Sequence, residues 1–260
     1  SVSVLNCAFS FLCTMELECK LIIDSGDIDT LIEALGTPIS IENQENHFLD
    51  SPDEVLHANH CTLRIRVNPG ASMAQCTLKE DSETMHGTCV RWSTHAEIPM
   101  KLAERVLREP EDLMSLSSNK VMNNTATASP DADADLLLTS PRGRENPITS
   151  TLRSKYGIET LKYAGGFKTV RRNFLHPGSE MQPQGLVLKL DAVELPASQN
   201  YYELEVVGVT VPLSDVLNEL CSFLEKVGVK YKPSEGSKYE VFVREKQSSL
   251  MNGDIRSPNA

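Results

Sequence analysis

The stretch Met15-Glu-Leu-Glu-Cys-Lys-Leu-Ile-Ile23 is the most informative segment of this sequence. Charged and apolar side chains alternate along it, so Glu16, Glu18 and Lys20 share one face and apolar residues fill the other. A period of two is the pattern of a β-strand with two different faces. The stretch therefore predicts a strand that is charged on one side and apolar on the other.

Four later segments repeat this alternation, at 61–67, 75–79, 186–191 and 201–206. The polar faces of the first two segments carry the bases Arg64, Arg66 and Lys79. The other two segments carry the acids Asp191, Glu203 and Glu205, together with one base, Lys189. A solvated sheet face more often mixes Thr, Ser, Gln and Lys. Same-sign sets therefore favour a face that binds something charged.

Three amphipathic helices are predicted, at 27–35, 99–108 and 212–227. Their apolar residues recur at helical spacing, and Gly36 and Gly228 end two of them. They supply a cover for the apolar faces of the strands. We therefore expect an α+β fold, in which a closed antiparallel β-barrel with a charged lumen is jacketed by helices.

The two signs of charge predict the kind of ligand. Burying either set alone would cost several kcal/mol per ion. A linear triphosphate with a divalent metal ion pairs with both sets, because phosphates accept from Arg and Lys while carboxylates bind the metal. The segment 165–168 lacks the spacing of a Walker A loop, so side chains are the expected phosphate ligands.

Eight pieces of the chain, in order, resemble motifs of the CYTH superfamily, the triphosphate tunnel metalloenzymes. The first resembles the ExExK signature, and the last resembles a late SKY segment. The pieces are 15–20, 46–53, 63–66, 76–79, 167–171, 188–191, 202–205 and 237–239. The resemblance implies an eight-stranded tunnel barrel, and it is closest to the small plant-type inorganic tripolyphosphatases.

The resemblance also implies a role for each matching residue. Metal ligands would be Glu16, Glu18, Asp191, Glu203 and Glu205, holding Mg or Mn. Phosphate ligands would be Lys20, Arg64, Arg66, Lys79, Arg91, Arg171, Lys189 and Lys238, and Glu18, Lys20 and Lys238 would act in catalysis. Lys189 is alternatively a partner of Glu203. Strand parity allows only one of Arg171 and Arg172 to point inward, and Arg171 is favoured.

The predicted function is metal-dependent hydrolysis of inorganic tripolyphosphate to pyrophosphate and phosphate. Thiamine triphosphate hydrolysis, adenylate cyclase-type use of ATP and noncatalytic polyphosphate binding are the alternatives. Only 5% of residues are aromatic, which favours an inorganic substrate over one with a large organic group. The intact acid set argues against a noncatalytic module, because carboxylates without metal repel polyphosphate.

The remaining composition bounds the partners. A net charge of −11 argues against nonspecific binding to nucleic acid or anionic membrane. Seven cysteines without a CxxC pair favour buried reduced thiols, so we expect a cytoplasmic protein, and a monomer.

The domain organisation is predicted from shifts in composition along the chain. We expect one tunnel domain at 15–246, interrupted by a disordered polar insertion at about 117–150. Residues 1–14 are read as an upstream segment without an assigned role, and 247–260 as a flexible tail.

Overall fold

The computed structural model describes residues 12–115, 146–176, 185–195, 200–207, 212–234 and 236–251. Most of the predicted upstream segment and most of the predicted insertion therefore lie outside the described residues. The same holds for the last nine residues of the predicted tail.

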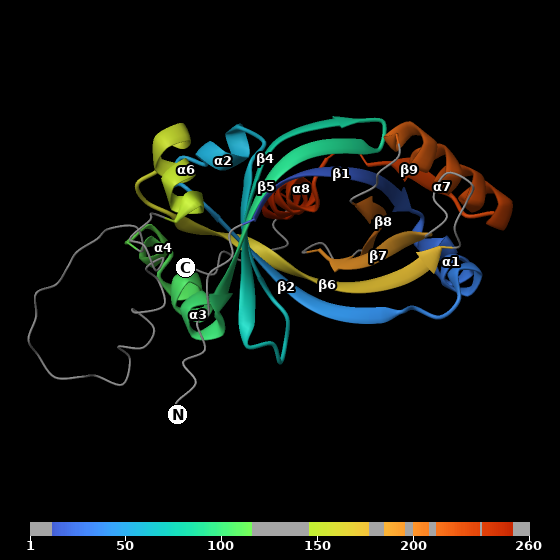
Figure 1. The fold of residues 1–260 in the computed structure, drawn as a ribbon, viewed down its shortest axis with the longest axis horizontal. Helices are drawn as coiled ribbons and strands as arrows, with labels where there is room; N and C mark the ends of the chain where they lie inside the picture. The colour runs from blue at the N-terminus through green and yellow to red at the C-terminus, as the bar shows by residue number, and fades with distance from the viewer. Residues whose placement is uncertain are drawn as a thin grey trace, which may run out of the picture. The chain divides into compact units, whose positions relative to one another are not determined.

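Nine strands form one sheet that closes on itself (Figure 1). They are β1 (Leu12–Ile23), β2 (Ser40–Asp50), β3 (Thr62–Val67), β4 (Met73–Met85), β5 (Thr88–Pro99), β6 (Lys162–His176), β7 (Leu186–Glu194), β8 (Asn200–Val207) and β9 (Tyr231–Pro233). The order is β5-β4-β3-β2-β6-β7-β8-β1-β9, and β5 also pairs with β1. This confirms the expected closed antiparallel eight-stranded barrel in an α+β fold, with β9 as an extra strand.

Seven α-helices and one 3-10 turn, η1 (Ser25–Asp27), accompany the sheet in the described part of the chain. The helices are α1 (Ile28–Leu35), α2 (Val55–Ala58), α3 (Met100–Arg108), α4 (Glu111–Ser115), α6 (Pro147–Tyr156), α7 (Leu213–Val227) and α8 (Lys238–Met251). The three predicted helices are confirmed as α1, α3 and α7, each within one residue of its expected bounds.

Two helices extend into segments that the sequence predicted to be loose chain. Helix α6 begins at Pro147, so the last four residues of the predicted insertion are helical. The Asn146 side chain accepts from the Ile148 N–H, and Pro147 fits the first helical turn, so this start carries its own capping signal. Helix α8 runs to Met251, which places the first residues of the predicted tail inside a helix.

The described residues divide into two compact units, each built from separated segments. One holds the described residues of 46–81 and 92–166, and the other holds the described residues of 15–45, 82–91 and 167–251. In the first unit, Leu63 and Ile65 of β3 are fully buried against a core that includes α3, α4 and α6. We call the second the acid unit, because the acidic residues discussed below all belong to it.

In the acid unit, α1 and α7 lie beside each other on the apolar faces of β1, β7 and β8 (Figure 1). Leu21, Leu190 and Leu204 from the strands and Leu220 from α7 are all at most 1% exposed. The alternate residues of these strands point to the opposite face, where the charged side chains gather. The helical cover thus decides which face of each strand carries the site.

Truncating Leu220 to alanine should lower the free energy of unfolding by about 2–5 kcal/mol, because it opens a cavity between α7 and the strands. Urea unfolding followed by circular dichroism measures the loss. Ser222→Ala on the exposed side of the same helix is the control, with an expected change within about 0.5 kcal/mol. Equal effects of the two changes would contradict the assigned packing of α7.

Candidate functional site

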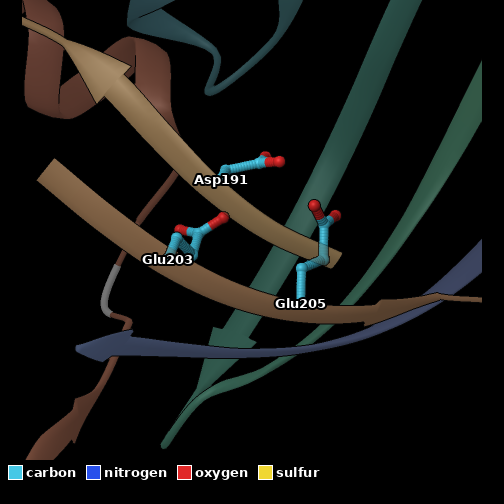
Figure 2. A group of neighbouring side chains, drawn as sticks. All are labelled: Asp191, Glu203 and Glu205. Atoms are coloured by element: carbon cyan, nitrogen blue, oxygen red, sulfur yellow. The ribbon is translucent and has the colours of Figure 1, made fainter. Parts of the chain in front are cut away.

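Three buried carboxylates form the centre of the acid unit. Asp191 projects from β7, and Glu203 and Glu205 project from β8, as Figure 2 shows. One carboxylate oxygen from each lies within 4.8 Å of the other two, and the residues are 1%, 0% and 6% exposed. We call these three residues the acid cluster.

The β7–β8 register explains this gathering. Asp191 lies opposite Glu203, and Lys189 lies opposite Glu205. Residues two apart on a strand share a face, so the four side chains lie together on the face opposite Leu190 and Leu204. The sequence predicts the alternation within each strand, whereas the register that pairs the two strands comes from the structure.

Arg171 of β6 binds two members of the acid cluster. It lies opposite Asp191 in the β6–β7 register. Its Nε donates to Asp191 Oδ1 and its Nη2 donates to Asp191 Oδ2, each over 2.7 Å. Nη2 also donates to Glu205 Oε2 over 2.9 Å. Neighbouring Arg172 is only partly buried. Arg171, which strand parity favours over Arg172 as the inward residue, thus contacts the acids, and its role as a phosphate ligand stays a prediction.

Lys238, the first residue of α8, contacts all three acids. Its Nζ lies 3.1 Å from Asp191 Oδ2 and 3.5 Å from Glu205 Oε2, and it also donates to Glu203 Oε1. Burial would raise the pKa of Asp191, but Lys238 and Arg171 outweigh burial and hold that pKa below its ordinary value. Conversely, the acids raise the pKa of Lys238 although burial opposes this. Asp191 and Lys238 therefore stay charged near neutral pH.

The first turn of α8 fixes the backbone of Lys238. The Ser237 N–H donates to the Glu240 carboxylate over 2.5 Å, and the Glu240 N–H donates to Ser237 Oγ over 3.2 Å. This reciprocal pair is a capping box, which stabilises a helix start. The motif Ser237-x-x-Glu240 is legible in the sequence and marks the position of this helix.

A second charged group lies along β1. Glu18 pairs with Lys20 and lies 3.4 Å from Arg91 Nε, and the three residues are 1%, 6% and 5% exposed. Lys20 lies opposite Glu205 in the β1–β8 register. Glu18 is thus held between two cations, and among the described residues the acids close enough to share a metal ion are those of the acid cluster.

Two further predicted residues of the acid unit, Glu16 and Lys189, are placed here by their burial and their strand positions. Glu16 is partly buried and is not one of the three clustered acids, so its role as a metal ligand stays a prediction. Lys189 is partly buried and lies opposite Glu205, whereas Asp191 occupies the place opposite Glu203. Its role as a phosphate ligand also stays a prediction.

The sequence reading missed three residues that touch this site. The Tyr201 hydroxyl donates to Glu203 Oε2 over 3.1 Å, and Ser234 Oγ donates to the same oxygen over 3.4 Å. The third missed residue is Cys89, whose Sγ accepts a hydrogen bond from Arg91 Nη2 over 2.9 Å. Tyr201 and Cys89 each stand two residues from a predicted site residue, so strand parity was an available signal for both. Ser234 offered none.

The predicted bases of the first unit lie on β3 and β4. In their register Arg64 lies opposite Thr77, Arg66 opposite Gln75, and Lys79 opposite Thr62. Arg66 Nε donates to Asn46 Oδ1 over 2.9 Å. The two arginines thus belong to the polar face of β3, and their role as phosphate ligands stays a prediction.

Two buried thiols fit the expected structural role. Burial raises the pKa of both the Cys19 and the Cys76 thiol to about 12, so both stay protonated at neutral pH. The described cysteines are all free thiols. Among the described helices, none has the length and apolar character that a membrane span requires.

Two of the solved structures similar to this chain come from Hippeastrum and Bacillus halodurans. HpAC1 from Hippeastrum, described as a candidate adenylyl cyclase with a dominant triphosphatase activity, is 23% identical with a TM-score of 0.69. That match covers 88% of this chain and 95% of HpAC1. A candidate adenylate cyclase from Bacillus halodurans is 19% identical with a TM-score of 0.57, over 88% of this chain and 98% of the other. At these identities the likeness establishes the fold.

No curated protein matches the sequence. The CYTH domain family matches residues 14–233, a range that holds both charged groups of the acid unit except for Lys238. This match spans most of the chain and agrees with the closed barrel. The chain belongs to the CYTH domain family.

Proposed function

We propose that the protein hydrolyses linear triphosphates with the help of a divalent metal ion, and that inorganic tripolyphosphate is cleaved to pyrophosphate and phosphate. The observation that carries the proposal is the acid cluster with Arg171 and Lys238 bound to it. An isolated set of three buried carboxylates would repel phosphate. The same set with a metal ion, beside several buried cations, is suited to binding it.

The donor set fits a hard cation. Carboxylate oxygens are the ligands that Mg²⁺ and Mn²⁺ prefer, and the acid cluster offers three side chains within 4.8 Å of one another. When bound, such an ion would neutralise phosphate charge and orient a water molecule. We propose that Asp191, Glu203 and Glu205 hold it. Glu16 and Glu18 are further proposed ligands from the family resemblance.

The buried cations of the acid unit are the proposed phosphate ligands. Arg171, Arg91 and Lys20 are each at most 9% exposed, and the side chain of Lys238 is 16% exposed. Charge-assisted hydrogen bonds from such groups stabilise the charge on phosphoryl oxygens during transfer. Lys189 in the acid unit and Arg64, Arg66 and Lys79 in the first unit are proposed for the same role.

Glu18 is the proposed general base. Its carboxylate is 1% exposed and is oriented by Lys20 and Arg91. A fixed carboxylate can accept a proton from an attacking water molecule. Glu18 would also hold both cations in place, so a neutral Glu18→Gln side chain is expected to impair binding as well as proton transfer.

Phosphate release tests the proposal directly. Tripolyphosphate, thiamine triphosphate and ATP are each offered with Mg²⁺, with Mn²⁺ and with EDTA. We expect phosphate to be released faster from tripolyphosphate than from the other two substrates. This release should require the metal ion and should stop in EDTA. No metal-dependent release from any substrate would contradict a hydrolase.

A second candidate activity, cyclisation of ATP, is favoured by the description of two similar structures as candidate adenylate cyclases. The same reactions are therefore assayed for cyclic AMP and pyrophosphate. Cyclic AMP formed faster than tripolyphosphate is cleaved would favour this candidate. We further propose that the protein is cytoplasmic, in line with the free thiols of its described cysteines, and that it acts as a monomer.

A further inference from the structure

Lys238 reaches every member of the acid cluster with one ammonium group. Its Nζ contacts Asp191 Oδ2, Glu205 Oε2 and Glu203 Oε1. These are the same three residues whose oxygens lie close enough to share a metal ion. The ammonium therefore contacts one oxygen of each carboxylate that a divalent ion would need as a ligand.

The balance of charge argues against both cations binding together. Arg171 and Lys238 face three carboxylates, so these five side chains together have a formal charge of −1. A divalent ion added beside Lys238 would leave one net positive charge and place two cations against each other in a buried site. A divalent ion that replaces Lys238 would leave the group neutral.

From this geometry, and on the basis of the proposed function, we infer that Lys238 and the metal ion compete for the acid cluster. Metal binding releases the Lys238 ammonium, which then becomes available to a phosphate oxygen of the substrate. Metal binding and completion of the phosphate site are thereby coupled. The order of events is metal first or metal with the triphosphate, and not triphosphate alone.

Lys238 is the cation of the two that is built to move. Arg171 sits within the paired strand β6 and binds Asp191 through two parallel hydrogen bonds, a rigid arrangement for a planar guanidinium. Lys238 ends in a flexible four-carbon chain from the first position of α8. The backbone there is fixed by Ser237 and Glu240, so the side chain can swing while the helix stays in place.

Lysine labelling of the wild-type protein tests the release without any substitution. The full chain is treated briefly with acetic anhydride, with and without saturating Mn²⁺ and without substrate, and the modified peptides are quantified by mass spectrometry. We expect labelling of Lys238 to rise at least about threefold with Mn²⁺. Exposed Lys230 should be unaffected. Unchanged or reduced labelling of Lys238 while Mn²⁺ binds would overturn the inference.

Metal affinity gives an independent measurement. If Lys238 occupies the carboxylates, the apparent dissociation constant for the metal ion equals the intrinsic constant divided by the fraction of protein in which the carboxylates are free. Lys238→Met should therefore bind Mn²⁺ at least about tenfold more tightly than wild type in calorimetric titrations without substrate. Lys189→Met, which removes the same charge opposite Glu205, controls for simple electrostatics and should shift affinity less than about threefold. Equal shifts in the two variants would overturn the competition.

Failure of the inference and failure of the proposed function have different signatures. A wild-type protein that binds Mn²⁺ and hydrolyses triphosphate, yet keeps Lys238 protected from labelling, overturns only the competition. A wild-type protein that binds no Mn²⁺ overturns both. Because labelling uses the unaltered chain, a Lys238→Met protein that fails to fold leaves the first measurement decisive.

Discussion

Replacement of Glu203 by glutamine is expected to reduce metal-dependent phosphate release at least about a hundredfold. Glu203 is 0% exposed, contacts Lys238 and lies within the acid cluster. Changes to the partners of metal ligands alone cost about 10–100-fold, so loss of a ligand charge should cost more. Glutamine keeps nearly the same volume, which isolates the effect of charge. Initial rates at saturating Mg²⁺, together with Mn²⁺ titration, measure the change.

Glu194→Gln is the matched control for this variant. Glu194 is an exposed acid on β7, on the strand that carries Asp191, and its replacement removes the same charge. Its activity should stay within a factor of two of wild type. Full activity of Glu203→Gln, or an equal loss in both variants, would remove the acid cluster from the proposed mechanism.

Replacement of Arg171 by methionine should lower the free energy of unfolding by about 3–5 kcal/mol. The guanidinium is the partner of two buried carboxylates, and removing one member of such a network leaves uncompensated buried charge. Guanidinium unfolding at pH 7 in EDTA measures the loss. Arg172→Met, next in sequence and only partly buried, should change stability by less than about 1 kcal/mol.

The loss in Arg171→Met should also depend on pH. A carboxyl group with a lowered pKa in the folded state contributes stability above its unfolded pKa, and that stability disappears as the pH falls through the folded value. The pKa of Asp191 is lowered by Lys238 and Arg171 against the effect of burial. The stability difference between wild type and the variant should therefore shrink in acid. A difference that is constant from pH 7 to pH 3 would contradict this account.

Much of the acid unit could be predicted because strands carry their chemistry with a period of two. Glu203 and Glu205 on β8 and Lys20 on β1 each lie on the polar face that alternation assigns to them. The three helices with regular apolar spacing were predicted for a similar reason, since α1 and α7 bury one stripe each. Periodicity is a local property, and a single sequence displays it.

The pairing of charges could not be predicted from the same signals. Glu18 and Asp191 were assigned a common role as metal ligands, yet Glu18 pairs with Lys20 and Arg91 while Asp191 pairs with Arg171 and Lys238. Apart from Glu18–Lys20, which lie two residues apart on one strand, these contacts join segments that are far apart in the chain, and most of them depend on strand register. Register is a global property, since it follows from turns, bulges and core packing elsewhere.

The extent of α6 and α8 was missed for a different reason. Polar composition around 147–150 and after Gln247 indicated loose chain, whereas both segments are helical. In α6, Ile148 and Leu152 are fully buried in the core of the first unit. A helix with few but well-placed apolar residues can be stable when its partners are present, and those partners lie elsewhere in the sequence.

The pairing of β7 with β8 limits which insertions, deletions and substitutions related sequences can tolerate in these strands. Asp191 faces Glu203 while Leu190 faces Leu204 one step away. A single inserted or deleted residue within either strand would exchange the acids for leucines, losing the charged face and the apolar face together. Insertions and deletions among related sequences should therefore be found mainly in the connections between strands. Substitutions within β7 and β8 should preserve the alternation even where the individual residues differ.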